Sequence, residues 1–150
     1  MKQRPGFTLH ELLISMLVML VLMSVATSSV TALRHRMDAR SAAYRYVAKH
    51  SLARAVAVRM GRTSQLRVDT IGKRIWVELE RSPTQRDTVG IVEYFEDGVK
   101  FRSTRTVLCF DARGMAKSGG NCESPDATVI FSLMGRADTI RTNGIGRIVR

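Results

Sequence analysis

An almost unbroken apolar run covers residues 14–26, and no proline or glycine occurs between residues 7 and 30. A helix over those residues would be about 36 Å long, enough to cross a bilayer. Beyond it, apolar or small residues recur at helical spacings of three, four and seven, at Leu33, Met37, Tyr44, Ala48, Leu52, Ala55 and Val56. We predict one long helix from Phe7 to about Met60, with any kink at Thr27 to Thr31. Gly61 is the expected C-cap.

After Gly61 the apolar spacing changes to two, which is typical of strands. The expected strands cover residues 65–69, 74–80, 91–95, 99–101, 106–110, 127–133, 139–141 and 145–149, with a polar loop at 82–87 and a turn at 135–136. No crossover helix separates them, so the strands should be antiparallel. The predicted fold class is α+β, a long N-terminal helix packed on a small antiparallel β-sheet head.

One carboxylate, Glu11, interrupts the start of the apolar segment. An ionised glutamate in hydrocarbon costs roughly 3 kcal/mol, so its position indicates a cationic partner. It follows a basic leader, Met1 to Pro5, then Gly6 and the sequence Phe-Thr-Leu. Together these residues resemble the type IV prepilin signature, although His10 stands where that family usually has an aliphatic residue.

The resemblance implies cleavage between Gly6 and Phe7 by a prepilin peptidase, followed by methylation of the Phe7 amine. It also implies that Glu11 pairs with the N-terminal amine of a neighbouring subunit during assembly. The expected parts are a leader at 1–6, a transmembrane and filament-core helix at 7–30, its amphipathic continuation at 31–61 and a periplasmic head at 62–150. The expected location is the inner membrane, with a single pass, and then a pilus or pseudopilus.

Two other readings of the N-terminus stay open. A secretory signal peptide would use Lys2 and Arg4 as its charged region and be cut after Ala26, but His10 and Glu11 would interrupt its apolar region. A plain membrane anchor would keep Met1. Arginines at 34, 36, 40 and 45 also argue against export of the following segment by the positive-inside rule. The first residue of the mature protein, Phe7, Thr27 or Met1, distinguishes the three readings.

Charge and cysteines constrain the partners and the compartment. The chain has 24 Lys and Arg against 13 Asp and Glu, a net charge of +11, which favours polyanions such as nucleic acid or anionic lipid. Its two cysteines, Cys109 and Cys122, predict a disulfide if the head is exported. Two free thiols are the alternative, and a zinc site lacks the ligands it needs.

The head also resembles the GspH/FimT group of minor pilins and pseudopilins. The similarity rests on Ala53-Arg54-Ala55-Val56, on Phe110-Asp111-Ala112-Arg113-Gly114 and on Gly146-Arg147. Some members of the FimT branch resemble DNA receptors of natural transformation, with a Gly-Arg-x-Arg motif in the tail. The arginines considered for DNA binding here are Arg136, Arg141, Arg147 and Arg150. The last two are spaced so that a strand would point them to opposite faces.

No catalytic motif is present in the sequence, and we expect neither an enzyme nor a cofactor. Glu78 and Glu80 are read as a solvated face of a strand, Trp76 as a core residue, and the basic helix face as solvated, with contact to a polyanion as the alternative. The function expected is that of a structural subunit of a type II secretion pseudopilus or type IV pilus, assembled with other pilins or pseudopilins. A DNA-binding minor pilin is the alternative.

Overall fold

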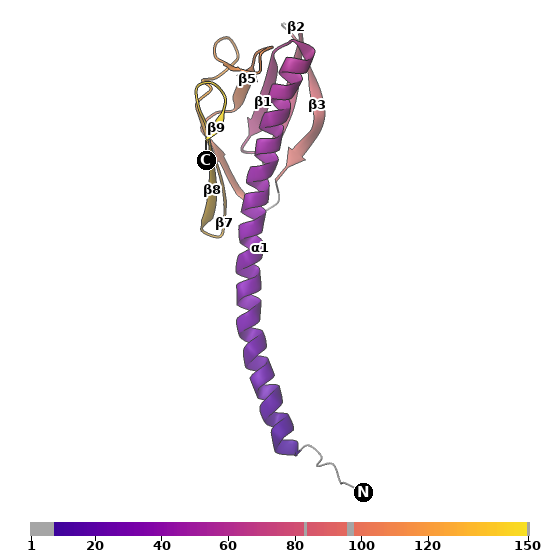
Figure 1. Ribbon diagram of the computed structural model, residues 1–150, viewed down its shortest axis with the longest axis vertical. Helices are drawn as coiled ribbons and strands as arrows, with labels where there is room; N and C mark the ends of the chain where they lie inside the picture. Colours follow the sequence, from indigo (N-terminus) through magenta and orange to yellow (C-terminus); the bar gives the residue numbers. More distant parts are fainter. Residues whose placement is uncertain (1–7, 83, 96–97, 150) are drawn as a thin grey trace. The chain divides into compact units, whose positions relative to one another are not determined.

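The computed structural model describes residues 8–82, 84–95 and 98–149, and it leaves the side chains of residues 25–38 undescribed. The chain forms two compact units, Met1–His35 and Arg36–Arg150. The first unit contains the first part of the N-terminal helix, and the second contains the rest of that helix and every described strand (Figure 1). The division of the chain into leader, membrane helix, continuation and head stays a prediction.

Helix α1 spans Leu9–Met60 without a break. It ends as the sequence indicates. Gly61 has a φ of +62°, its N–H donates to the carbonyl of Val58, and the N–H of Arg62 donates to the carbonyl of Ala57. This pair of bonds is a Schellman motif, which satisfies carbonyls that the helix end would otherwise leave unpaired.

Five strands form one antiparallel sheet in the order β3-β2-β1-β5-β6. Their bounds are β1 Ser64–Asp69, β2 Arg74–Ser82, β3 Gln85–Tyr94, β5 Val107–Phe110 and β6 Ala116–Lys117. In Figure 1 the part of α1 beyond residue 36 runs beside β1 and β3. The strands β1, β2 and β5 were predicted, whereas β6 was not, because two residues give too short a pattern to recognise.

The polar loop predicted at residues 82–87 is wrong. The pairs Ser82↔Gln85 and Glu80↔Arg86 continue the ladder between β2 and β3 almost to its end. Further along, the register shifts opposite Trp76, and Gly90 has a φ of +76° at that point. An irregularity of this kind bends a strand, and a Cβ at Gly90 would lie 3.7 Å from the Leu52 side chain of α1. The polar residues Gln85, Arg86 and Asp87 made this strand look like a loop, because it lies at a solvated sheet edge.

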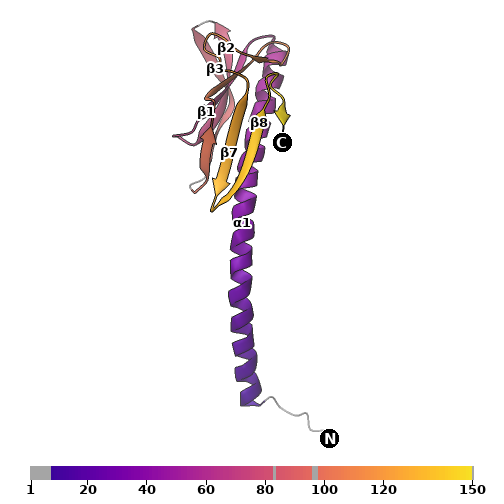
Figure 2. The same cartoon turned by 90° about the vertical axis from the view of Figure 1, so that its left-hand side faces the viewer.

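Four strands form the second antiparallel sheet in the order β4-β7-β8-β9. Their bounds are β4 Lys100–Ser103, β7 Ala127–Leu133, β8 Arg136–Thr142 and β9 Ile148–Val149. Figure 2 shows β7 and β8 side by side. Their turn is Met134-Gly135, one residue earlier than predicted, and both residues have positive φ, as a two-residue type I′ turn requires. The final strand is shorter than predicted.

The buried face of α1 differs from the predicted stripe. Of the predicted stripe, Val56 is buried and Leu52 packs against the core, whereas Tyr44, Ala48 and Ala55 are exposed. The side chains of Leu33 and Met37 lie outside the described residues. The other helix residues in the core are Ala39, Ala42, Ala43, Tyr46, Ala53 and Ala57. Alanines allow the helix to approach the sheets closely, while Phe95, Phe101 and Phe131 pack together with ring centroids 4.9 to 5.0 Å apart. Buried Lys49 and His50 interrupt this face in the sequence, which made the other face look more apolar.

Candidate assembly site

The carboxylate of Glu11 is bonded to its own helix start. Its Oε2 accepts hydrogen bonds from the backbone N–H of Thr8 at 3.1 Å and from the Thr8 hydroxyl at 3.0 Å. In return the N–H of Glu11 donates to Thr8 Oγ1 at 3.4 Å. This is a capping box, which satisfies N–H groups that the first helical turn leaves unpaired. Glu11 is thus a helix cap in addition to an exposed acid, and Gly6 and Phe7 lie outside the described residues.

The helix after Glu11 presents apolar side chains to all sides. Between Leu9 and Met23 the large apolar residues are 50% to 80% exposed; they are Leu9, Leu12, Leu13, Ile14, Met16, Leu17, Val18, Met19, Leu20, Val21, Leu22 and Met23. A helix that is apolar all round is stable only when something else covers it, another protein or lipid. Ser15 in this stretch and Ser24 directly after it bond back to carbonyls of the preceding turn and so expose little polarity.

A membrane span was predicted for residues 7–30. Within the part of the chain that the structure describes, no helix is long and apolar enough to cross a membrane. Phe7 and the side chains of residues 25–30 of that predicted span lie outside the described residues.

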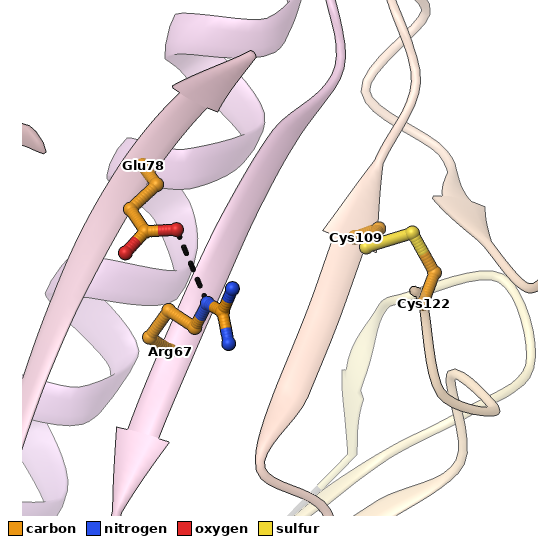
Figure 3. The surroundings of a disulfide bond; sticks show 4 residues. All are labelled: Arg67, Glu78, Cys109 and Cys122. Atoms are coloured by element: carbon orange, nitrogen blue, oxygen red, sulfur yellow. Dashed lines mark hydrogen bonds and ion pairs between the residues drawn. A yellow bond between two sulfur atoms is a disulfide. The ribbon is translucent and has the colours of Figure 1, made fainter. Parts of the chain in front are cut away.

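The disulfide predicted from the cysteine count is present between Cys109 and Cys122 (Figure 3). Cys109 lies in β5 and is 1% exposed, and its Cα is 5.6 Å from that of Cys122. The bond closes the loop that contains β6 and thereby ties it to the edge of the five-stranded sheet. The reading with two free thiols is wrong.

Residues of the Phe-Asp-Ala-Arg-Gly sequence form the turn between β5 and β6. Asp111 Oδ1 accepts the N–H groups of Arg113 and Met115, both at 2.9 Å. The carbonyl of Gly114 accepts a hydrogen bond from Arg54 Nε at 2.8 Å, and Gly114 itself has a φ of +74°. A Cβ at Gly114 would lie 2.9 Å from Val58 Cγ2. These residues therefore fasten the turn to the last turns of α1.

Three comparisons bear on identity. A family model described as the prokaryotic N-terminal methylation motif matches residues 1–27. The minor pseudopilin EpsH of the type 2 secretion system of Vibrio cholerae superposes with a TM-score of 0.60 at 11% identity, over 75% of this chain and 94% of that one. The type IV minor pilin FimU of Pseudomonas aeruginosa gives a TM-score of 0.57 at 19% identity, over 76% and 88%.

A further structure of EpsH gives a TM-score of 0.57 at 10% identity, over 77% of this chain and 95% of that one. No curated protein sequence matches the chain. The chain therefore has a fold similar to that of minor pilins and pseudopilins, and its first 27 residues match the N-terminal methylation motif. The solved structures that it resembles are described as a minor pseudopilin and a type IV minor pilin.

Cations on the basic face of the helix are partly used inside the head. Lys49 is 8% exposed, and its Nζ lies 2.5 Å from the carbonyl oxygen of Ile91 and 3.8 Å from Glu93 Oε1. Arg45 Nη1 donates to the carbonyl of Tyr94 at 3.5 Å. These cations hold the end of β3 against α1. The expectation of a solvated basic face is wrong for Lys49, and no pattern in the sequence distinguishes it from its exposed neighbours.

The three described arginines that were considered for DNA binding do not form one cluster. Arg136, Arg141 and Arg147 are exposed, and Arg150 lies outside the described residues. Arg136 and Arg141 are five residues apart in β8, so the pleat points their side chains to opposite faces of the sheet. Arg147 follows the turn closed by its own N–H, which donates to Asn143 Oδ1 at 2.7 Å.

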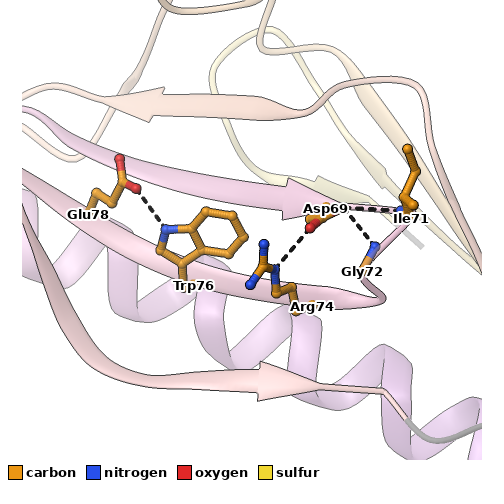
Figure 4. Close-up of polar contacts among 6 residues, drawn as sticks. All are labelled: Asp69, Ile71, Gly72, Arg74, Trp76 and Glu78. Carbon is orange, nitrogen blue, oxygen red and sulfur yellow. Dashed lines mark hydrogen bonds and ion pairs between the residues drawn. The ribbon is translucent and has the colours of Figure 1, made fainter.

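Trp76 is not a core residue. It is half-buried on the outer face of β2, its indole N–H donates to Glu78 Oε1 at 2.7 Å, and the guanidinium of Arg74 lies 5.3 Å from its ring centroid (Figure 4). Glu78 Oε2 accepts Arg67 Nε at 3.1 Å, so this glutamate is paired rather than solvated (Figure 3). Strand alternation assigns Ile75 and Val77 to the core and puts Trp76 outside it.

The turn between β1 and β2 lies next to Arg74 and Trp76 (Figure 4). Asp69 Oδ1 accepts the N–H groups of Ile71 and Gly72 at 3.1 and 2.8 Å, and Oδ2 accepts Arg74 Nε at 2.9 Å (Figure 4). These bonds lower the pKa of the Asp69 carboxyl, and the hydrogen bond from the Gly72 N–H contributes most. Among the residues the structure describes, no group of three or more His, Cys, Asp or Glu could hold a metal ion.

Proposed function

We propose that the protein is a minor pilin or pseudopilin, a structural subunit of a type II secretion pseudopilus or type IV pilus. It enters the inner membrane through residues 7–30 with its head in the periplasm, and a prepilin peptidase cuts it between Gly6 and Phe7, after which Phe7 is methylated. The observation that carries the proposal is the helix that begins in the Thr8 and Glu11 capping box and exposes apolar side chains on every side.

Assembly exchanges one apolar environment for another. In the membrane the side chains from Leu9 to Met23 contact lipid, and in the filament they contact the helices of neighbouring subunits. The Glu11 carboxylate has one oxygen, Oε2, bonded to Thr8, whereas no described residue bonds Oε1. Oε1 can therefore accept the Phe7 amine of a neighbour while Oε2 keeps the helix start closed. A charge pair of this kind aligns subunits along the filament because the apolar contacts alone are non-directional.

The test separates the charge of Glu11 from its capping role. Glu11→Gln keeps a side chain able to cap but removes the charge, and Glu11→Ala removes both. Thr8→Val removes the hydroxyl bonds of the capping box but keeps the charge and the bond from the backbone N–H of residue 8. We expect all three to be processed to Phe7, by mass spectrometry of the mature chain. Recovery in sheared filaments should fall with both Glu11 variants and stay near the native level with Thr8→Val. Native recovery of the Glu11 variants would contradict the proposal.

A second candidate is a DNA-binding minor pilin, and one observation favours it. Lys100, Arg102 and Arg141 share the outer face of the four-stranded sheet, because each pairs with a β7 residue on the side opposite buried Phe131 and Val129. No described residue forms an ion pair with any of the three. The remaining outward positions on β7 are Thr128, Ile130 and Ser132, so no acid interrupts this surface.

Duplex binding measured against salt concentration tests this candidate. Removing one cation that binds a phosphate should reduce the slope of log affinity against log salt by about one. We expect Lys100→Ala with Arg102→Ala to flatten the slope, and Arg147→Ala with Arg150→Ala to do so if the tail takes part. An unchanged slope in both double variants would remove this candidate.

A further inference from the structure

Three arginines surround a hollow at the C-terminal end of α1. Its lining consists of Ser51, Arg54, Ala55, Val58 and Arg59 from the helix and Arg113 and Gly114 from the turn between β5 and β6, around a volume of about 500 Å³. No acidic residue is part of this lining. Residues separated by more than fifty positions thus bring three guanidinium groups to one hollow, which we call the arginine groove.

Arg54 is oriented before any ligand arrives. Its Nε donates to the carbonyl of Gly114 at 2.8 Å, and the side chain is half-buried, so the guanidinium is held in place at one edge. No described residue bonds its two terminal nitrogens. A guanidinium fixed in this way loses little freedom when it binds a carboxylate with its remaining N–H groups.

The charge of the groove is not balanced within the head. Arg59 and Arg113 are exposed and form no ion pair with a described residue. The carboxylate in the same turn, Asp111, already accepts the N–H groups of Arg113 and Met115 through Oδ1. The end of α1 supplies about half a negative charge, which suits Arg59 but is outweighed by three cations.

The lining also constrains the shape of the ligand. Ala55 and Val58 form apolar contact surface between the arginines. The methylene groups of a glutamate or aspartate side chain can contact that surface while the carboxylate meets the guanidinium groups. A DNA backbone, by contrast, presents a line of phosphates and requires cations spread along a surface rather than gathered around one hollow.

We propose that the arginine groove is a docking site for an acidic side chain of a different, acidic subunit in the same filament. The proposal rests on the function proposed above, because it names the chemistry of a partner in assembly. A second copy of this chain is disfavoured, since copies cut after Gly6 keep 22 Lys and Arg against 13 Asp and Glu, a side-chain charge of +9, and repel one another. The groove then fixes the contact between two kinds of subunit at the head, independently of the charge pair at Glu11.

A titration of the full-length chain in detergent micelles tests the groove without a filament. The probe is a hexaglutamate peptide, followed through the side-chain Nε–H NMR signals of Arg54, Arg59 and Arg113. We expect these signals to shift and saturate. Arg59→Gln with Arg113→Gln should weaken binding about tenfold or more, because two guanidinium groups can no longer bind the carboxylates. The matched control, Arg62→Gln with Arg136→Gln, removes the same charge from exposed sites outside the groove and should change affinity less than about twofold.

Three outcomes would overturn the proposal. They are an absence of saturable shifts, equal weakening in both double variants, and groove signals that respond to duplex DNA but not to hexaglutamate. A filament assay completes the test: Arg59→Glu with Arg113→Glu should give a processed subunit with reduced recovery in sheared filaments, and native recovery would count against a role in assembly. Because the titration needs no filament, failure of the groove and failure of the pilin function are distinguishable.

Discussion

The imidazole of His50 meets the ring of Phe110 edge-on, with the ring centroids 5.0 Å apart and the planes at 84°. His50 is 2% exposed, and its Nε2 has no hydrogen-bond partner among the described residues. Burial, followed by the charge of Arg54, lowers the pKa of His50 to about 4. A neutral histidine thus fills a position in the core where helix α1 meets β5.

This position predicts a loss of stability in acid. The unfolded chain takes up the His50 proton as the pH falls below 6.5, whereas the folded chain does so only near pH 4. The free energy of unfolding should therefore be unaffected by His50 above pH 6.5 and fall by roughly 3 kcal/mol between there and pH 4. Urea unfolding followed by the fluorescence of Trp76, the single tryptophan, measures it. In His50→Leu the fall should be smaller, and an equal fall would show that other groups cause it.

The close approach of Gly114 to Val58 predicts a second effect on stability. Gly114→Ala places a Cβ 2.9 Å from Val58 Cγ2 at a φ of +74°. The matched control is Gly119→Ala, where φ is +103° but no atom lies within 4 Å of the added Cβ. Both variants should lose about 1 kcal/mol from the backbone conformation, and Gly114→Ala about 1 to 3 kcal/mol more from the steric clash. Equal losses in urea unfolding would mean that Val58 moves aside.

The third prediction concerns the stability that the disulfide provides. Cys109 and Cys122 are separated by 13 positions, so in the chain-entropy model their bond stabilises the head by about 3 kcal/mol. The double variant Cys109→Ala with Cys122→Ala should lower the free energy of unfolding by that amount. Reduction of the native protein with dithiothreitol serves as the control and should produce a similar loss. A double variant as stable as the oxidised protein would contradict the prediction.

The contacts of Lys49 predict a local effect on β3. Lys49→Met keeps the aliphatic stem but removes the ammonium group from the carbonyl of Ile91 and from Glu93. That carbonyl loses its partner, so we expect a loss of about 1 to 3 kcal/mol and faster amide exchange at residues 91–94 by hydrogen-deuterium exchange. Arg40→Met is the control, since Arg40 is exposed and contacts Tyr44 on its own helix. Faster exchange in both variants would rule out the specific contact.

Several features of the fold could be predicted because short-range rules govern them. The helix ends at Gly61 because glycine adopts the left-handed backbone conformation with the least strain. Strand β7 was recognised because Ala127, Val129, Phe131 and Leu133 alternate with more exposed residues. The capping box was also visible in the sequence, as Thr8 followed three residues later by Glu11. It was not recognised there, because Glu11 was considered only as an acid in an apolar segment.

Other features depend on which surfaces meet. Trp76 was expected in the core but lies on the outer face of its sheet, and Lys49 was expected in solvent but is buried under the end of β3. The arginine groove likewise requires Arg113 to reach the helix residues Arg54 and Arg59. Sequence spacing carries no information on such long-range contacts, since the same residue types occur on solvated faces.

The sequence by itself determined the N-terminal motif, the apolar helix, its end at Gly61, an antiparallel head and the pairing of Cys109 with Cys122, because each follows from local backbone preferences, periodicity or a count. Only the tertiary structure decided which face of α1 is buried, which cations are used inside the head and which remain available to a partner. The physical reason is that burial depends on contacts between segments far apart in the chain, whereas periodicity describes one segment at a time.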